Sequence, residues 1–262
     1  MPQARKTVQQ RTTLCAIRND FIMIDISDIL CDTSHRPFAL PVGQWKYYQE
    51  WNNALFLHWI IPLDLLRKYI PDELHIDSYE GNYYISLVAF TMQKIRPKYL
   101  PSVKFISDFH EINLRTYIDN ENKKGVYFLS IEAEKHLSAF VARRLSGLPY
   151  EKSTIKRGVK TYKSKNPTNH FVLDAEFEVK EKLPDKSGLD KWLTERYCLY
   201  LDLNKKMFRY DIHHKEWELK NVVIKNLQLD YKIGDFNLSD RPPDLAHYSH
   251  GVKVLTWDRL KV

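Results

Sequence analysis

Phe109-His-Glu-Ile-Asn-Leu-Arg-Thr-Tyr117 is the stretch of this sequence that best reveals its fold. On an extended chain, the aliphatic side chains of Ile112 and Leu114 fall on one face and polar groups fall on the other. This period of two predicts a half-buried β-strand. The polar face carries an acid, an amide and a guanidinium in one row, namely Glu111, Asn113 and Arg115. That row is ordinary surface if the face meets solvent, and a polar pocket if the face lines a closed sheet.

Composition is that of a globular protein rich in strands. The chain of 262 residues is 44% hydrophobic and 28% charged, and its 13% of aromatic residues suits strands better than helices. The net charge of +7 raises the question of nucleic acid or an anionic ligand. Because the charge is spread along the chain and no nucleic-acid motif accompanies it, a solvated surface is favoured and no nucleic-acid partner is predicted.

The cysteines and the hydropathy pattern bear on location. Cys15, Cys31 and Cys198 match neither a disulfide framework nor a zinc site, which indicates a reducing compartment. No apolar run approaches the length of a membrane span, and charged residues interrupt the apolar stretches before residue 30. The sequence therefore predicts a cytoplasmic protein without a membrane partner.

The chain is expected to form one domain over residues 35–262. Residues 1–34 are polar and without periodicity, so we expect an extension that is partly disordered or forms a short helix. Alternating apolar residues and intervening turn residues predict strands over 45–51, 55–61, 83–94, 109–118, 126–133, 171–181, 197–203, 207–213 and 222–231. Short helices are predicted at 62–70, 136–146 and 187–193. Many hairpins and few helices predict an α+β fold, mainly antiparallel, whose sheet closes on itself.

A second group of polar residues follows the predicted helix 136–146. Arg143 lies beside the apolar stripe of that helix, and the breaks at Gly147 and Pro149 lead to Tyr150. From Arg143 to Lys165 there are eight basic residues and one acid. Such a segment is either a basic rim that attracts carboxylate or phosphate ligands, or a solvated basic loop.

Several motifs resemble those of one protein family. They are His35-Arg-Pro, Leu55-Phe-Leu-His-Trp59, Glu111-Ile-Asn-Leu-Arg-Thr-Tyr117, Gly125-Val-Tyr-Phe, Ala142-Arg143, Leu148-Pro-Tyr150, Leu193-Thr-Glu-Arg-Tyr197 and Pro243-Asp-Leu-Ala-His-Tyr-Ser249. In this order they resemble the YqjF-like family of uncharacterised, mostly bacterial proteins, over about residues 35–262. That family looks like a distant relative of acetoacetate decarboxylase, which implies a closed β-barrel around a mostly apolar pocket.

The resemblance also suggests which residues line that pocket. In acetoacetate decarboxylase a lysine forms a Schiff base with a keto acid and glutamates assist. The assisting glutamate maps onto Glu111, whereas the lysine position falls on Tyr150. A phenol cannot form an imine, so Schiff-base decarboxylation is not carried over. Lys152 lies two residues further on, on the same face of an extended segment but about 6–7 Å away.

These observations predict a small-molecule pocket for an organic acid or carbonyl compound. Two classes of function stay open: a binding protein, and a lyase-type enzyme without the lysine. In the second class Glu111 and Tyr150 are the catalytic pair, while Asn113, Arg115 and Arg143 bind the ligand. No cofactor is predicted, and no metal, because the histidine pairs lack the spacing of known metal motifs. The sequence leaves open whether the protein is a homo-oligomer.

Two structural expectations follow. Glu111 and Arg115 should face the inside of the barrel, with Ile112 and Leu114 packed outside it under the helix 136–146. The side chains of Glu111 and Tyr150 should meet in one cavity. A buried carboxylate needs a partner, and we expect an arginine, either Arg115 or Arg143, to supply it.

Overall fold

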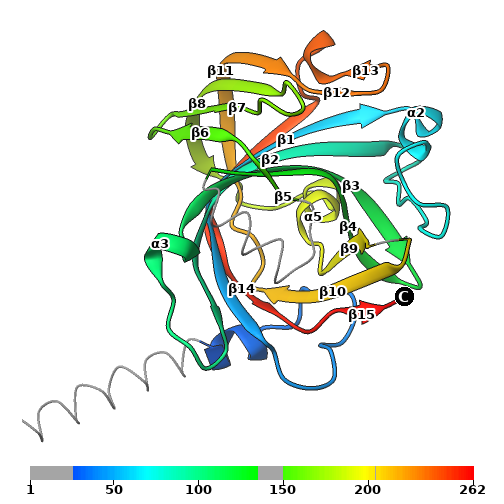
Figure 1. Ribbon diagram of the computed structural model, residues 1–262, viewed down its shortest axis with the longest axis vertical. Helices are drawn as coiled ribbons and strands as arrows, with labels where there is room; N and C mark the ends of the chain where they lie inside the picture. Colours follow the sequence, from blue (N-terminus) through cyan, green and yellow to red (C-terminus); the bar gives the residue numbers. More distant parts are fainter. Residues whose placement is uncertain (1–25, 135–149, 204) are drawn as a thin grey trace, which may run out of the picture.

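The computed structural model describes residues 26–134, 150–203 and 205–262 (Figure 1). The strands are β1 Tyr47–Ile61, β2 Tyr83–Pro97, β3 Phe109–Asn120, β4 Lys123–Ala133, β5 Tyr150–Lys152, β6 Thr154–Arg157, β7 Thr161–Lys165, β8 Val172–Lys182, β9 Cys198–Asp202, β10 Met207–His214, β11 Lys220–Asp230, β12 Lys232–Ile233, β13 Phe236–Asn237, β14 Leu245–Thr256 and β15 Leu260–Lys261. The helices with defined bounds are α2 Leu63–Arg67, α3 Lys104–Ser107, α5 Gly188–Thr194 and the 3-10 turn η1 Leu238–Asp240.

The sheet closes into a ring. Strands β10, β9, β4, β3, β2, β1 and β14 follow one another through hydrogen bonds, and β14 also pairs with β10. Neighbours in the ring are antiparallel except β4 and β9, which are parallel. This arrangement confirms the predicted α+β class with mainly antiparallel strands.

A second layer continues from β14. Strands β11, β8, β7 and β6 extend the same sheet beyond the ring and arch over it, as the upper part of Figure 1 shows. Within the basic segment 143–165, the residues between 154 and 165 form the antiparallel pair β6 and β7 rather than a loop. Their lysines alternate with buried side chains such as Ile155 and Tyr162, so the charges lie on the outer surface of that layer.

The two faces of the ring strands enter different cores. Ile112 and Leu114 pack outward, in a cluster that includes Phe177 of the second layer. The sheet extension thus covers this face, and the predicted helix 136–146 lies outside the described residues. The alternate residues of the same strand face inward, in a cluster that includes Phe109 and Tyr117.

β-Bulges keep the inward face continuous along the bent strands. The sequence analysis predicts two strands at 45–51 and 55–61, but the structure has one strand, β1, whose register with β2 shifts between Asn52 and Leu55. Asn53 has a φ of 55°, a left-handed conformation that an asparagine tolerates. Because of the extra residue, Trp51 and Ala54 both face the inside of the ring.

Helix α5 lies in the interior of the ring in the view of Figure 1. The sequence analysis places a helix at 187–193, and the structure has it at Gly188–Thr194. Ser187 caps it, accepting from the Asp190 backbone while the Asp190 side chain accepts from the Ser187 backbone. The helix predicted at 62–70 is shorter in the structure and ends at Arg67. The Arg67 guanidinium donates to backbone carbonyl groups of the turn that follows.

The described part of the N-terminal segment is attached to the ring. Residues 26–31 form a helical turn in which Ile26 and Ile29 are buried with Trp45 and Trp257. The domain boundary at residue 34 stays a prediction. Among the described residues, no helix is long and apolar enough to cross a membrane.

Candidate functional site

A cavity of about 320 Å³ lies within the ring of strands. Its walls are mostly apolar and aromatic, with side chains including Trp51, Phe56, Val88, Phe90, Met92, Phe109, Phe128, Leu199 and Trp217. Arg96 near the end of β2 and Leu100 of the β2–α3 connection also line it. This volume and lining are typical of sites for small ligands, in which a few polar groups fix the orientation.

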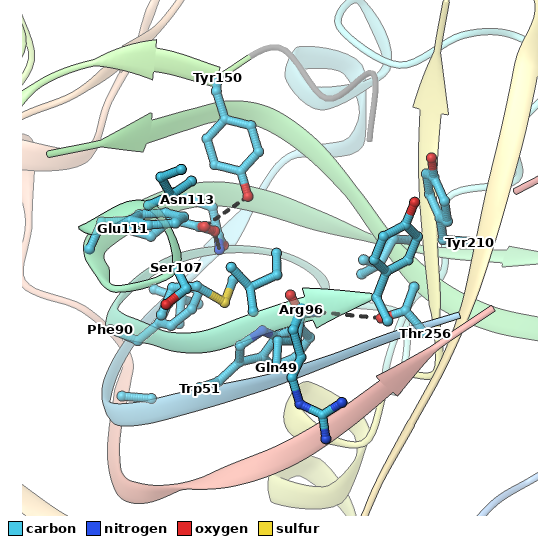
Figure 2. A pocket seen from close by; sticks show the side chains of 18 of the residues that line it. Gln49, Trp51, Phe90, Arg96, Ser107, Glu111, Asn113, Tyr150, Tyr210 and Thr256 are labelled. Carbon is cyan, nitrogen blue, oxygen red and sulfur yellow. Dashed lines mark hydrogen bonds between the residues drawn. The ribbon is translucent and has the colours of Figure 1, made fainter. Parts of the chain in front are cut away.

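Three polar side chains meet on one wall of this cavity. The Tyr150 hydroxyl donates to Glu111 Oε2 at 2.9 Å, and Asn113 Nδ2 donates to Glu111 Oε1 at 3.2 Å. Figure 2 shows Tyr150 pointing toward Glu111 and Asn113, while Gln49 and Arg96 lie on another side. Tyr150 reaches the pair because β5 runs parallel to β4, with Tyr150 opposite Ile131. The predicted meeting of Glu111 and Tyr150 is therefore present.

Burial controls the ionisation of this cluster. Glu111 is 3% exposed, and burial raises its pKa to about 7 against the opposing hydrogen bonds from Tyr150 and Asn113. Burial and the neighbouring carboxyl group raise the pKa of Tyr150 well above its usual value, so the phenol keeps its proton. Glu111 can thus exchange a proton near neutral pH while Tyr150 remains a hydrogen-bond donor.

Arg115 lines the same cavity and is 9% exposed. Its guanidinium lies 5.8 Å from the centre of the Phe56 ring and interacts with the Tyr117 hydroxyl. Burial lowers the pKa of Arg115, and Glu111 acts in the opposite direction. Among the described residues no carboxylate lies within ion-pair distance of the Arg115 guanidinium, and its Nε atom has no hydrogen-bond partner. Asn113 Oδ1 is also buried without a partner.

The predicted arginine partner of Glu111 is wrong for Arg115. Glu111 and Arg115 both face inward, as expected, but four residues of extended chain place their Cα atoms about 13 Å apart. Tyr150 and Asn113 donate hydrogen bonds to the Glu111 carboxylate instead. Arg143, the other predicted partner and ligand-binding residue, lies outside the described residues.

No lysine is among the described residues that line the cavity. Lys152 is exposed, and in β5 it lies opposite Ala133 at the end of β4. Tyr150 and Lys152 lie on the same side of the strand, but Tyr150 is buried and Lys152 is exposed. Among the described residues, no lysine amine therefore lies next to Glu111.

Sequence reasoning missed most of the cavity wall. Phe90 and Val88 alternate with other apolar residues in β2, so no pattern distinguishes the inner face of that strand from its outer face. Trp217 comes from the loop after β10, where no periodicity applies. Trp51 could have been found from its place beside the predicted turn, but only if the bulge at Asn53 had been recognised.

The ring and its inner cavity define a class of protein: the fold is that of acetoacetate decarboxylase-like enzymes. The chain is similar to acetoacetate decarboxylase from Legionella pneumophila, with a TM-score of 0.54 at 13% identity over 88% of this chain and 95% of that chain. An acetoacetate decarboxylase-like enzyme from Sphingomonas wittichii RW1 has a TM-score of 0.56 at 12% identity, covering 86% of this chain and 97% of that one. The enduracididine biosynthesis enzyme MppR, complexed with pyruvate, has a TM-score of 0.57 at 10% identity, covering 85% and 92%.

The chain belongs to the DUF2071 family of uncharacterized conserved proteins, whose model matches residues 48–253. It is 34% identical to the uncharacterized protein YqjF of Bacillus subtilis over 230 residues, which cover 84% of this chain and 93% of that protein. The family and the fold resemblance predicted from the motifs are both confirmed.

Proposed function

We propose that this protein binds a small organic acid inside the ring, with the carboxylate of the ligand on Arg115. The observation that carries this proposal is the buried guanidinium that faces an apolar cavity and, among the described residues, pairs with no carboxylate. A buried charge without a partner costs several kcal/mol. An anionic ligand would supply the missing partner by a charge-assisted hydrogen bond.

The remaining walls indicate what the rest of the ligand is. Aromatic and aliphatic side chains fill most of the lining, so the ligand has an apolar body. At the other end, the second N–H of Asn113 and a protonated Glu111 are donors for a second polar group such as a carbonyl oxygen. Since Arg115 and Glu111 are about 13 Å apart along β3, the two polar groups should be separated by several carbons.

A pyruvate complex of MppR supports a carbonyl-bearing acid, because that protein shares the fold. The comparison concerns the fold alone, since the two chains are 10% identical. A cytoplasmic location, indicated by the cysteine content, stays a prediction.

Calorimetry with a matched pair of probes tests whether the ligand is an acid. We expect 5-oxohexanoate, a keto acid with its ketone several carbons from the carboxylate, to bind. Its neutral amide should bind at least about tenfold more weakly, because it cannot supply a charge to Arg115. Equal affinity for acid and amide would show that Arg115 does not select the ligand.

A second candidate function is a lyase-type reaction that begins with proton removal next to the carbonyl. The pKa of Glu111 near 7 favours it, because a base of this strength can take a proton and return it at neutral pH. Tyr150 would donate a hydrogen bond to the carbonyl oxygen as negative charge develops there.

Proton exchange distinguishes this enzyme from a binding protein. In heavy water, the wild-type protein should speed deuterium incorporation next to the ketone of 5-oxohexanoate, and Glu111→Gln should abolish the effect. Borohydride reduction with the same probe should leave no adduct on Lys152, which is exposed and outside the cavity lining. If wild type and Glu111→Gln exchange protons equally slowly, the protein binds without this chemistry.

A further inference from the structure

A chain of buried polar groups runs from the cavity to helix α5. Starting from α5, His247 Nε2 lies 2.8 Å from Asp190 Oδ1, and His247 Nδ1 lies 3.2 Å from His58 Nε2. His58 Nδ1 lies 2.6 Å from Ser86 Oγ, which lies 2.6 Å from the Tyr117 hydroxyl. Tyr117 in turn interacts with Arg115, which lines the cavity. The chain thus links a carboxylate to the guanidinium through four neutral side chains.

The register of the ring strands builds this chain. His58 of β1 lies opposite Ser86 of β2, and Ser86 lies opposite Arg115 of β3. These three residues form one row across neighbouring strands, on the inner face. Tyr117 follows Arg115 by two residues on the same face, and the neighbouring α5 supplies Asp190. All six side chains are buried.

The two ends of the chain fix the direction of every hydrogen bond between them. Arg115 can only donate, and an ionised Asp190 can only accept. His247 therefore donates from Nε2 to Asp190 and, when neutral, accepts at Nδ1 from His58 Nε2. His58 Nδ1 must then accept, and Ser86 Oγ at 2.6 Å is a better placed donor than the Tyr117 hydroxyl at 3.5 Å. Ser86 in turn accepts from Tyr117 at 2.6 Å. Tyr117 is left with an oxygen lone pair for Arg115.

The surroundings keep the two imidazoles neutral. Burial, His247 and Arg115 all lower the pKa of His58 well below its usual value. Burial lowers the pKa of His247, although Asp190 acts in the opposite direction, and Lys186 lowers it further. Burial acts to raise the pKa of Asp190, but hydrogen bonds from Ser187 and His247 outweigh it and keep the carboxylate ionised.

The other nearby charge has its own partner. Arg196 lies over the Tyr117 ring, with 4.9 Å from its guanidinium carbon to the ring centre, and pairs with Asp77 at 2.6 Å. It does not need the chain as a counter-charge. Within the described residues, the hydrogen bonds from Asp190 run as far as Tyr117, whose hydroxyl lies beside the Arg115 guanidinium.

We propose that Asp190, His247, His58, Ser86 and Tyr117 are positioning residues that orient Arg115 through one directional hydrogen-bond chain. This inference rests on the proposed function, because it explains how the guanidinium is held without a direct ion pair that would occupy its ligand-facing N–H groups. Hydrogen bonds aligned in one direction polarise one another, so Asp190 acts as a distant counter-ion. Binding of a ligand carboxylate to Arg115 should therefore change the hydrogen bonding of both histidine rings.

The tautomers test the chain in the ligand-free protein. In nitrogen NMR spectra of the full chain with ¹⁵N-labelled histidine, His58 and His247 should each carry the proton on Nε2 and none on Nδ1 at neutral pH. Replacing Asp190 by Asn, which can donate as well as accept, should give a mixture of tautomers. A doubly protonated His247, or His58 protonated on Nδ1, would reverse the chain and overturn the proposal.

Transmission of binding tests the positioning role. Titration with 5-oxohexanoate should shift the His58 and His247 ring nitrogens in the wild type. Ser86→Ala removes one link outside the cavity lining, so these shifts should vanish and the probe should bind several-fold more weakly. The matched control is Ser130→Ala, since Ser130 is also buried in a ring strand but its hydroxyl has no partner.

The two proposals fail in different ways. If the wild-type protein binds no carboxylate but shows the expected tautomers, the chain exists and the proposed function is wrong. If the probe binds and the histidine shifts persist in Ser86→Ala, the ligand site stands and the positioning chain is wrong.

Discussion

Glu111→Gln is expected to stabilise the protein at pH 8 by about 3 kcal/mol and to change little at pH 4. The pKa of Glu111 is raised from 4.5 to about 7 by burial. Between these values the folded protein holds a proton that the unfolded chain has released, so stability falls as the pH rises. Each pKa unit corresponds to about 1.4 kcal/mol, and the full cost is reached above the folded pKa.

The glutamine removes this cost: its oxygen accepts from Tyr150, and its NH2 group donates to the Asn113 oxygen once the Asn113 amide turns over. Urea unfolding of both proteins at pH 4, 6 and 8 measures the difference. Glu176→Gln is the matched control, because Glu176 is an exposed strand residue and its substitution should leave the pH dependence unchanged. If the stability of Glu111→Gln and of the wild type changed with pH in the same way, the buried Glu111 carboxyl group would not be the source of the pH dependence.

Arg115→Met is expected to weaken binding of 5-oxohexanoate about 100-fold while stabilising the ligand-free protein by about 2 kcal/mol. Both effects have one cause, the buried guanidinium without a carboxylate partner. Removing it deletes the charge that would bind the ligand, and an apolar side chain of similar length relieves the cost of burying that charge. Opposite changes in affinity and stability are unusual for a residue whose role is only structural.

Calorimetric titration and thermal unfolding of the same samples measure the two effects. Arg157→Met is the matched control: Arg157 is half-buried but lies outside the cavity lining, and it donates to Asn53 O at 2.6 Å. That variant should lose stability and keep its affinity. Arg115→Met proteins that are both destabilised and fully able to bind would contradict the proposed site.

The central strand could be predicted because one face is aliphatic and the other is polar. In β3 the alternation identifies both faces, and a closed sheet explains why the polar face is buried. The position of Tyr150 beside Glu111 followed from the family resemblance, not from periodicity, because 39 residues separate them. Such long-range pairs depend on the order of strands in the sheet, which local patterns do not contain.

Other parts of the site depend on features that single-sequence patterns conceal. At the bulge at Asn53, the residues of β1 that face the inside of the ring change from odd-numbered to even-numbered positions. Trp51 and Phe56 therefore line the same cavity. The prediction that Arg115 pairs with Glu111 was wrong because the spacing along β3 separates the two residues, whereas Arg143 lies outside the described residues. His58 and His247 were visible as motif residues, but only the register between β1, β2 and β14 places them in one chain.

We propose above that Arg115 binds a ligand carboxylate inside the ring. A crystal structure of the protein with bound 5-oxohexanoate tests it most directly. We expect the ligand carboxylate to accept hydrogen bonds from the Arg115 guanidinium, with the ketone oxygen near Tyr150 and Asn113 and the carbon chain against Phe56. A ligand bound outside the cavity, or an Arg115 guanidinium paired with a carboxylate of the protein itself, would contradict the claim.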